Sequence, residues 1–211
     1  MRKLFLTLTL VFATTAFADV ADVAAVSREP TVLVLGDSLS AGYGIALEES
    51  WVSLLASRLD REGYEHRVVN ASVSGDTTSG GLTRLGPALA RHRPELVIIE
   101  LGGNDGLRGL PLGVVKENFR SMIEQSRAAG AEVVLLGMRI PTNYGPRYTE
   151  SFQALYREMA ERYELEWVEF FLDGVALDED LMLPDGIHPN AAAQPVLLDN
   201  AWPAVEAALA D

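Results

Sequence analysis

Short apolar runs that alternate with helical segments are the feature that most limits the folds open to this chain. Continuous runs of this length, rich in Val, Ile and Leu, are typical of parallel strands buried on both faces. The expected strands are Thr31–Leu35, Arg67–Ala71, Leu96–Leu101, Glu132–Met138 and Glu166–Phe171. The pattern therefore predicts an α/β domain with a five-stranded parallel sheet between two helical layers.

The segments between these runs carry apolar residues at helical spacing. Glycine or proline closes several of them, as at Gly63, Pro94 and Gly130. The expected helices are Trp51–Glu62, Thr77–Ala90, Leu112–Ala129, Tyr148–Tyr163 and Ala191–Ala210. No linker, repeat or low-complexity stretch divides them, so we expect one domain over residues 29–211.

The first residues have the three parts of a secretory signal peptide. Arg2 and Lys3 precede an apolar run, and the A-x-A pattern of residues 16–18 predicts cleavage after Ala18. The run is too short to cross a bilayer comfortably, which argues against a membrane anchor. We therefore expect a signal peptide at 1–18, a lead-in segment at 19–28 and a periplasmic or secreted protein.

Charge and cysteine content exclude several classes of function. The formal net charge is −13, and it becomes −15 once residues 1–18 are removed, so binding to nucleic acid is unfavourable. The chain has no cysteine, which excludes a disulfide scaffold and a thiol nucleophile. No two histidines have metal-ligand spacing, so we expect neither a metal nor another cofactor.

Four polar, glycine-rich segments lie after strands of the predicted sheet. They are residues 36–40, 70–76, 102–105 and 183–190. Ligands of such folds bind beyond the carboxyl ends of the strands, so we expect these segments to converge on one rim.

The side chains on this rim are those that acyl transfer by a serine requires. Ser38 would be the nucleophile, His188 its base, and Asp185 the group that fixes the imidazole tautomer. The backbone N–H groups of Ser38 and Gly75 and the Asn104 amide would stabilise the oxyanion.

Each of these residues also has a purely structural interpretation. Ser38 could cap the next helix, Gly75 could only form a turn, and Asn104 could bond its own loop. Asp185 could cap the last helix, although Asn190, followed by three alanines, is the better candidate. Asp37, Asp76 and Asp105 are expected to bond loop backbone and orient these neighbours.

The same segments resemble a known family. GDSLSAGYG (36–44), SGDTTSGGL (74–82), GGND (102–105) and DGIHPN (185–190) are similar to the four blocks of the SGNH, or GDSL, hydrolases. The runs VVNASVSGDTTSGGLTRL, VIIELGGNDGLRG and RIPTNYGPRY resemble its bacterial periplasmic thioesterase/lysophospholipase/arylesterase subgroup. The resemblance implies a flavodoxin-like sheet ordered 2-1-3-4-5 and the site roles given above.

Two loops of the predicted rim could line an acyl groove, or could simply pack on their own side chains. Their candidate substrate-binding residues are Leu107, Arg108, Leu110, Ile140, Pro141 and Tyr144. We expect a monomeric serine esterase, without a membrane anchor, that acts on short or medium acyl esters, arylesters and lysophospholipids or thioesters. The alternatives are a carbohydrate acetylesterase on the same fold and a secreted binding module without catalysis.

Overall fold

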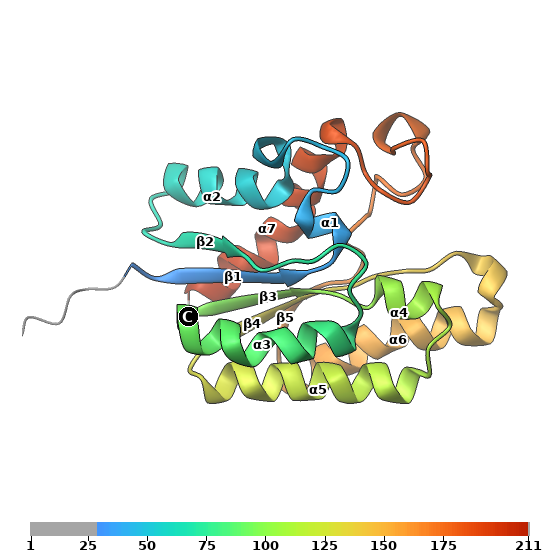
Figure 1. Ribbon diagram of the computed structural model, residues 1–211, viewed down its shortest axis with the longest axis horizontal. Helices are drawn as coiled ribbons and strands as arrows, with labels where there is room; N and C mark the ends of the chain where they lie inside the picture. Colours follow the sequence, from blue (N-terminus) through green and yellow to red (C-terminus); the bar gives the residue numbers. More distant parts are fainter. Residues whose placement is uncertain (1–28, 211) are drawn as a thin grey trace, which may run out of the picture.

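A sheet of five parallel strands forms the centre of the computed structural model, which describes residues 29–210 (Figure 1). The strands lie in the order β2-β1-β3-β4-β5, so the predicted fold class and strand order are confirmed. Their bounds are β1 (Thr31–Gly36), β2 (Arg67–Asn70), β3 (Leu96–Glu100), β4 (Glu132–Leu136) and β5 (Glu166–Val168).

Helices cover both faces of this sheet. Figure 1 shows α2 and α7 on one side, with α3, α5 and α6 on the other. The α-helices are α1 (Ser38–Ala41), α2 (Trp51–Arg61), α3 (Thr78–His92), α4 (Gly103–Leu107), α5 (Leu112–Ala128), α6 (Pro146–Tyr163) and α7 (Gln194–Ala210). Short 3₁₀ turns are η1 (Leu47–Glu49), η2 (Thr142–Tyr144), η3 (Glu179–Leu181) and η4 (Ala191–Ala193).

The central strand β3 and its neighbour β1 supply the middle of the core. Every residue of β1 and β3 is buried, and most are Val, Ile or Leu, which fit a strand covered on both faces. β3 ends on Glu100, whose carboxyl is buried among these apolar side chains. Because β1 and β3 are parallel neighbours inside the sheet, the loops after them lie over the middle of the edge formed by the carboxyl ends of the strands.

Helix ends follow the signals in the sequence. The hydroxyl of Ser50 accepts a hydrogen bond from the N–H of Ser53 at the start of α2, and Thr77 caps α3 in the same way. α3 ends where Arg93 adopts φ 44° ahead of Pro94, which has no N–H to continue the helix.

Some boundaries differ from the prediction. β5 ends at Val168 because the chain leaves the sheet to bury Phe171, whose ring lies 5.2 Å from that of Trp51. The terminal helix begins at Gln194, after the separate turn η4. Residues 103–107, predicted as a loop, form α4. Apolar periodicity does not detect a helix as short and glycine-rich as α4.

The predicted signal peptide (1–18) and lead-in segment (19–28) lie outside the described residues. Among residues 29–210, none of the helices combines the length and the apolar character that a membrane span requires.

Candidate active site

Ser38 is the first residue of α1, directly after the carboxyl end of β1. Asp37, and not Ser38, caps this helix, because the Asp37 Oδ1 accepts the N–H of Leu39 at 3.1 Å. The helix ends after one turn at Gly42, whose φ of 72° is readily adopted by glycine. The Ser38 hydroxyl is therefore not used as a helix cap.

A chain of hydrogen bonds joins Ser38, His188 and Asp185. The Nε2 atom of His188 lies 2.9 Å from Ser38 Oγ, and its Nδ1 atom lies 2.7 Å from Asp185 Oδ2. Ser38 and His188 are 150 residues apart in sequence, so the fold itself brings them together. This order of hydroxyl, imidazole and carboxylate is the one required for a serine nucleophile with an oriented base.

The turn that carries His188 also fixes the carboxylate of Asp185. The backbone N–H groups of Ile187 and His188 donate to Asp185 Oδ1 at 2.9 and 3.0 Å. The His188 N–H contributes most to lowering the pKa of Asp185 to about 2, followed by the bond to the His188 ring. Asp185 therefore stays ionised at any ordinary working pH, with Oδ2 directed at the imidazole.

Asn190, not Asp185, caps the last helical segment. The Asn190 Oδ1 atom accepts from the N–H groups of Ala192 and Ala193 at 2.9 and 3.3 Å. Its Nδ2 atom donates to the carbonyl of Asp180 at 2.7 Å, which ties this segment to η3. The structural interpretation thus applies to Asn190, and Asp185 is left to bond the histidine.

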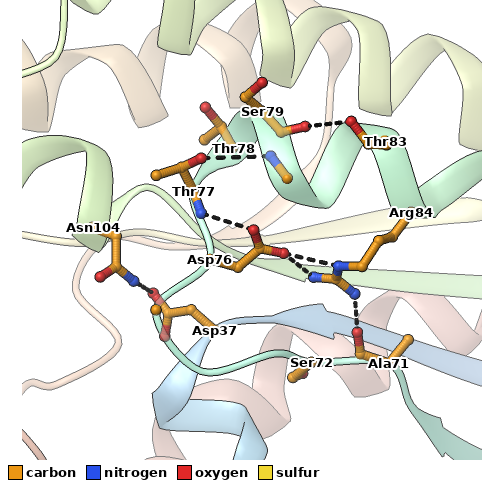
Figure 2. A network of polar contacts seen from close by, with 12 residues as sticks. Asp37, Ala71, Ser72, Asp76, Thr77, Thr78, Ser79, Thr83, Arg84 and Asn104 are labelled. Carbon is orange, nitrogen blue, oxygen red and sulfur yellow. Dashed lines mark hydrogen bonds and ion pairs between the residues drawn. The ribbon is translucent and has the colours of Figure 1, made fainter.

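Asn104 lies beside the Ser38 turn and does not bond its own loop through its side chain. Its Nδ2 donates to Asp37 Oδ2 at 2.9 Å, a contact between residues 67 positions apart (Figure 2). A primary amide carries two N–H donors, so one remains for a substrate oxygen. Asp37 therefore sets the orientation of the Asn104 amide, as expected for a carboxylate of this block.

Two arginines bond the loop that carries Gly75. Arg84 donates to the carboxylate of Asp76 and to the carbonyl of Ala71, as Figure 2 shows. Arg108, from the segment after Asn104, donates to the carbonyl of Gly75 at 2.8 Å. Gly75 has a φ of 78°, so the turn uses the freedom of glycine.

The third aspartate of the blocks joins α3 to α4. Asp105 is buried, and its two carboxylate oxygens accept the N–H of Thr78 at 2.8 Å and its hydroxyl at 2.6 Å. This pair fixes the start of α3, just after the Gly75 loop, against the helix that carries Asn104.

The buried carboxyl of Asp37 gives a testable pH dependence of stability. Burial raises the pKa of Asp37 from 3.8 to about 6, although the Leu39 N–H and the Asn104 amide oppose this shift. The folded protein thus holds the proton more tightly than the unfolded chain. The contribution of Asp37 to the free energy of unfolding is therefore fully present below pH 4. It is lost as the pH rises to about 6, and the loss is at most about 3 kcal/mol.

We therefore expect the wild type to lose stability relative to Asp37→Asn between pH 4 and pH 6. Urea unfolding of both proteins across this range measures the difference. An asparagine at position 37 can still accept the N–H of Leu39 through its Oδ1 atom and so cap α1. Its NH₂ group would face the amide of Asn104, but the cost of that contact does not vary with pH. A constant difference across the range would contradict the raised pKa.

The six predicted substrate-binding residues lie at this edge of the sheet in different settings. Ile140 is buried and packs under α4, whereas Leu107 and Tyr144 are exposed. The Tyr144 hydroxyl donates to the carbonyl of Leu107 at 2.7 Å, so the two predicted loops are in contact. A groove of about 400 Å³ adjoins them; its lining residues are Leu112, Tyr144, Gly145, Pro146, Arg147, Tyr148 and Ser151. Of the predicted set, only Tyr144 lines this groove.

Sequence reasoning missed two residues of the site. The ring of Tyr43 lies 4.4 Å from that of His188, and Glu100 lies buried below the Ser38 turn. Tyr43 belongs to the first block, GDSLSAGYG. Nothing in its residue type or position in that block indicates that its ring contacts the histidine. Glu100 is the single charged residue of an apolar run, and this was the only feature of the sequence that could have indicated a role for it.

The other histidines lie elsewhere. His66 bonds Glu95 at 3.2 Å before the start of β3, and His92 ends α3. Across residues 29–210, no three His, Asp or Glu side chains are grouped as metal ligands would be.

Comparison with known proteins gives the family of this architecture and site. Residues 34–195 match the model of the GDSL-like Lipase/Acylhydrolase family, a range that includes all the candidate catalytic residues. The esterase TesA of Pseudomonas aeruginosa is 52% identical over 176 residues, which cover 83% of this chain and 88% of that protein.

A second relative and a solved structure agree with this match. Thioesterase 1/protease 1/lysophospholipase L1 of Escherichia coli K12 is 44% identical over 169 residues, 80% of each chain. The crystal structure of TesA superposes with a TM-score of 0.82 at 52% identity, and the match covers 84% of this chain and 99% of that one.

Proposed function

The chain belongs to the GDSL-like lipase/acylhydrolase family and is a serine ester hydrolase, and we propose that Ser38, His188 and Asp185 carry out its chemistry. The observation that carries this proposal is the chain of hydrogen bonds from Ser38 Oγ through the His188 ring to Asp185, at 2.9 and 2.7 Å. It supports a nucleophile that already contacts its base.

In the first half of the reaction, Ser38 Oγ attacks the carbonyl carbon of the ester. His188 Nε2 takes the hydroxyl proton, and Asp185 stabilises the imidazolium that results. The bond from the carbonyl carbon to the alcohol oxygen then breaks, and the alcohol leaves with the proton from Nε2. The acyl group remains on Ser38 as an ester.

In the second half, water replaces the alcohol. His188 Nε2 takes a proton from the water while its oxygen attacks the acyl carbon. Ser38 Oγ then leaves and recovers that proton, which releases the carboxylic acid and restores the site.

We assign the oxyanion donors to Ser38, Gly75 and Asn104. The first two would donate backbone N–H groups, and Asn104 would donate the N–H that Asp37 does not use. Donors held in place before the reaction stabilise the developing charge without reorganisation, typically by ~2.7–4 kcal/mol each. The hydrogen bonds that Asn104 donates to Asp37 and that Arg108 donates to the Gly75 carbonyl support such fixed positions.

Exposed apolar side chains at the catalytic edge support an acyl substrate. In the described part of the chain, the large exposed ones all lie between a strand's carboxyl end and the first turn of the next long helix. They are Tyr43, Leu47, Val73, Leu107, Val114, Tyr144, Leu177 and Ile187. Apolar surface gathered around a polar site is typical of a binding region, since isolated apolar residues would scatter over the whole surface.

We propose that the groove beside α6 takes the acyl chain. Leu112, Tyr144 and Tyr148 line it, and its volume of about 400 Å³ exceeds the needs of an acetyl group. Short and medium acyl esters, arylesters and lysophospholipids fit these features. A carbohydrate acetylesterase would have less use for an aliphatic rim.

We also propose export to the periplasm or the medium, from the signal-peptide pattern that ends at Ala18. Acyl-CoA would not be met in that setting, and the net charge of −15 that remains without residues 1–18 disfavours a polyanionic thioester. Thioester hydrolysis would then be an accessory activity, and oxygen esters the main substrates.

An acyl-chain series tests the groove. Each methylene buried in it adds about 0.8 kcal/mol, so kcat/KM for p-nitrophenyl esters should rise up to about fourfold per carbon until the groove is filled. Ser151→Trp, which fills the groove, should remove this rise and leave the acetyl ester unaffected. Steady-state kinetics from acetyl to decanoyl esters measures both effects.

The matched control is Ser57→Trp, on the exposed face of α2. It should leave the chain-length profile unchanged. A Ser151→Trp profile parallel to the wild type would show that the acyl chain lies elsewhere. Higher activity on acetylated xylan than on any acyl ester or lysophospholipid would favour the acetylesterase instead.

A further inference from the structure

Glu100 is a fully buried carboxyl that the mechanism does not use. It ends β3 in the middle of the sheet and pairs in register with Gly36, the last residue of β1. Burying a carboxyl among apolar side chains is costly unless its oxygens are bonded. Glu100 Oε1 is buried and has no partner within the part of the chain described, so its cost is only partly offset.

The other oxygen of Glu100 bonds both sides of the nucleophile. Oε2 accepts the hydroxyl of Ser40 at 2.7 Å and the N–H of Asp37 at 3.3 Å. Asp37 immediately precedes Ser38, and Ser40 follows it by two residues. One buried oxygen thus spans the turn that presents Ser38.

Ser40, the third residue of α1, connects this helix to two other segments. It is buried; Trp51 Nε1 donates to its hydroxyl at 3.2 Å, and Asn70 Nδ2 donates to its carbonyl at 2.7 Å. A helix of four residues has too few internal hydrogen bonds to hold its own shape. The position of Ser38 therefore depends on contacts of this kind.

The close approach of Glu100 to the turn also requires Gly36. A Cβ at Gly36 would lie 2.7 Å from Glu100 Oε2 and 2.7 Å from Ser40 Oγ. These two atoms form the hydrogen bond between Glu100 and Ser40, so a larger residue at position 36 would push the carboxyl and the hydroxyl apart.

The contact does not need a charge on Glu100. Burial, together with the nearby Asp37 carboxylate, holds the pKa of Glu100 well above its usual range. A neutral side chain with one oxygen at the Oε2 position can accept the same two hydrogen bonds.

We propose that Glu100 is a positioning residue for the nucleophile: its Oε2 holds Asp37 and Ser40 so that Ser38 Oγ meets the His188 ring. The proposal rests on Ser38 being the nucleophile. Glu100 acts only through these neighbours and touches no substrate. A small displacement of a reacting atom can cost about 10²-fold in rate.

The test compares Glu100→Leu, Glu100→Gln and Ser40→Ala. We measure kcat and KM for p-nitrophenyl acetate, and the rate at which a phosphonate ester modifies Ser38, with each protein kept well below its melting temperature. Leu removes the acceptor oxygen, so kcat and the modification rate should both fall ~10- to 100-fold, with little change in KM. Gln keeps the acceptor oxygen and should restore most of both rates.

Ser40→Ala removes one partner without changing Glu100, and it should lower both rates in the same way. The matched control is Ser126→Ala, a buried serine of α5 whose hydroxyl donates to the Met122 carbonyl of its own helix. It should leave kcat unchanged. If the effect passes through Ser40, Glu100→Leu combined with Ser40→Ala should lose less than the two single losses multiplied together.

Two results would overturn the proposal. One is a Glu100→Leu or Ser40→Ala protein that melts at a lower temperature but keeps kcat and the Ser38 modification rate, which would leave only a structural role. The other is a Glu100→Gln protein as impaired as Glu100→Leu. Failure of the proposed function would look different, since the phosphonate would then not modify Ser38 in the wild type.

Discussion

Replacing Ser38 with alanine is expected to lower kcat for p-nitrophenyl esters by about 10⁶-fold, the scale seen when the serine of a catalytic triad is removed. His188 Nε2 would keep its position 2.9 Å from the site of the missing oxygen, but no covalent intermediate could form. The free energy of unfolding should change little, because the Ser38 side chain bonds only the His188 ring among the described residues.

Burst kinetics and urea unfolding of Ser38→Ala together test this expectation. The variant should show no burst of p-nitrophenol and should unfold at about the wild-type urea midpoint. The control is Ser126→Ala, which removes a buried hydroxyl that donates to the Met122 carbonyl within α5 and should keep the burst. Wild-type activity in Ser38→Ala would refute Ser38 as the nucleophile.

The sequence predicted the fold well because its signals are local and repeated. Apolar β-branched runs gave the position of each strand, and residues such as Ser50 and Pro94 marked helix ends. The errors fell where local pattern is weak. α4 is short and glycine-rich, so it has no apolar periodicity to detect. β5 stops at Val168 because Phe171 packs into the core, and this packing cannot be read from the apolar pattern.

Only part of the candidate site could be predicted from the sequence. Ser38, Asn104 and His188 carry reactive or polar groups in segments that follow strands, so residue type and topology are enough to expect them on one rim. Glu100 could not be assigned in this way, because its contact with Ser40 depends on the register of β1 against β3 and on the absence of a side chain at Gly36.

Most of the groove's lining could not be predicted from the sequence, which named only Tyr144 among its residues. It lies between Leu112 and the first two turns of α6, and neither segment belongs to the polar blocks. Its shape follows from how α5 and α6 pack, which apolar periodicity alone does not give.

Replacing Asp185 with asparagine is expected to lower kcat by about 10⁴-fold, because the imidazole would take the wrong tautomer. The N–H groups of Ile187 and His188 both donate to Asp185 Oδ1, so an asparagine must keep its carbonyl oxygen there. Its NH₂ group then occupies the Oδ2 position, 2.7 Å from His188 Nδ1. Nδ1 must accept that hydrogen bond, which puts the ring proton on Nε2 and leaves no lone pair for the proton of Ser38.

The turn around Asp185 makes this tautomer argument testable apart from stability. Nδ1-protonated imidazole in the wild type and Nε2-protonated imidazole in Asp185→Asn would have different ¹⁵N chemical shifts, with the hydrogen bonds to Ile187 and His188 retained. The matched control is Asp178→Asn, which keeps the cap on the N–H of Asp180 at the start of η3 and should leave both kcat and the His188 spectrum unchanged. An Asp185→Asn protein that keeps wild-type kcat would mean that the carboxylate does not orient the base, whatever the distance between them.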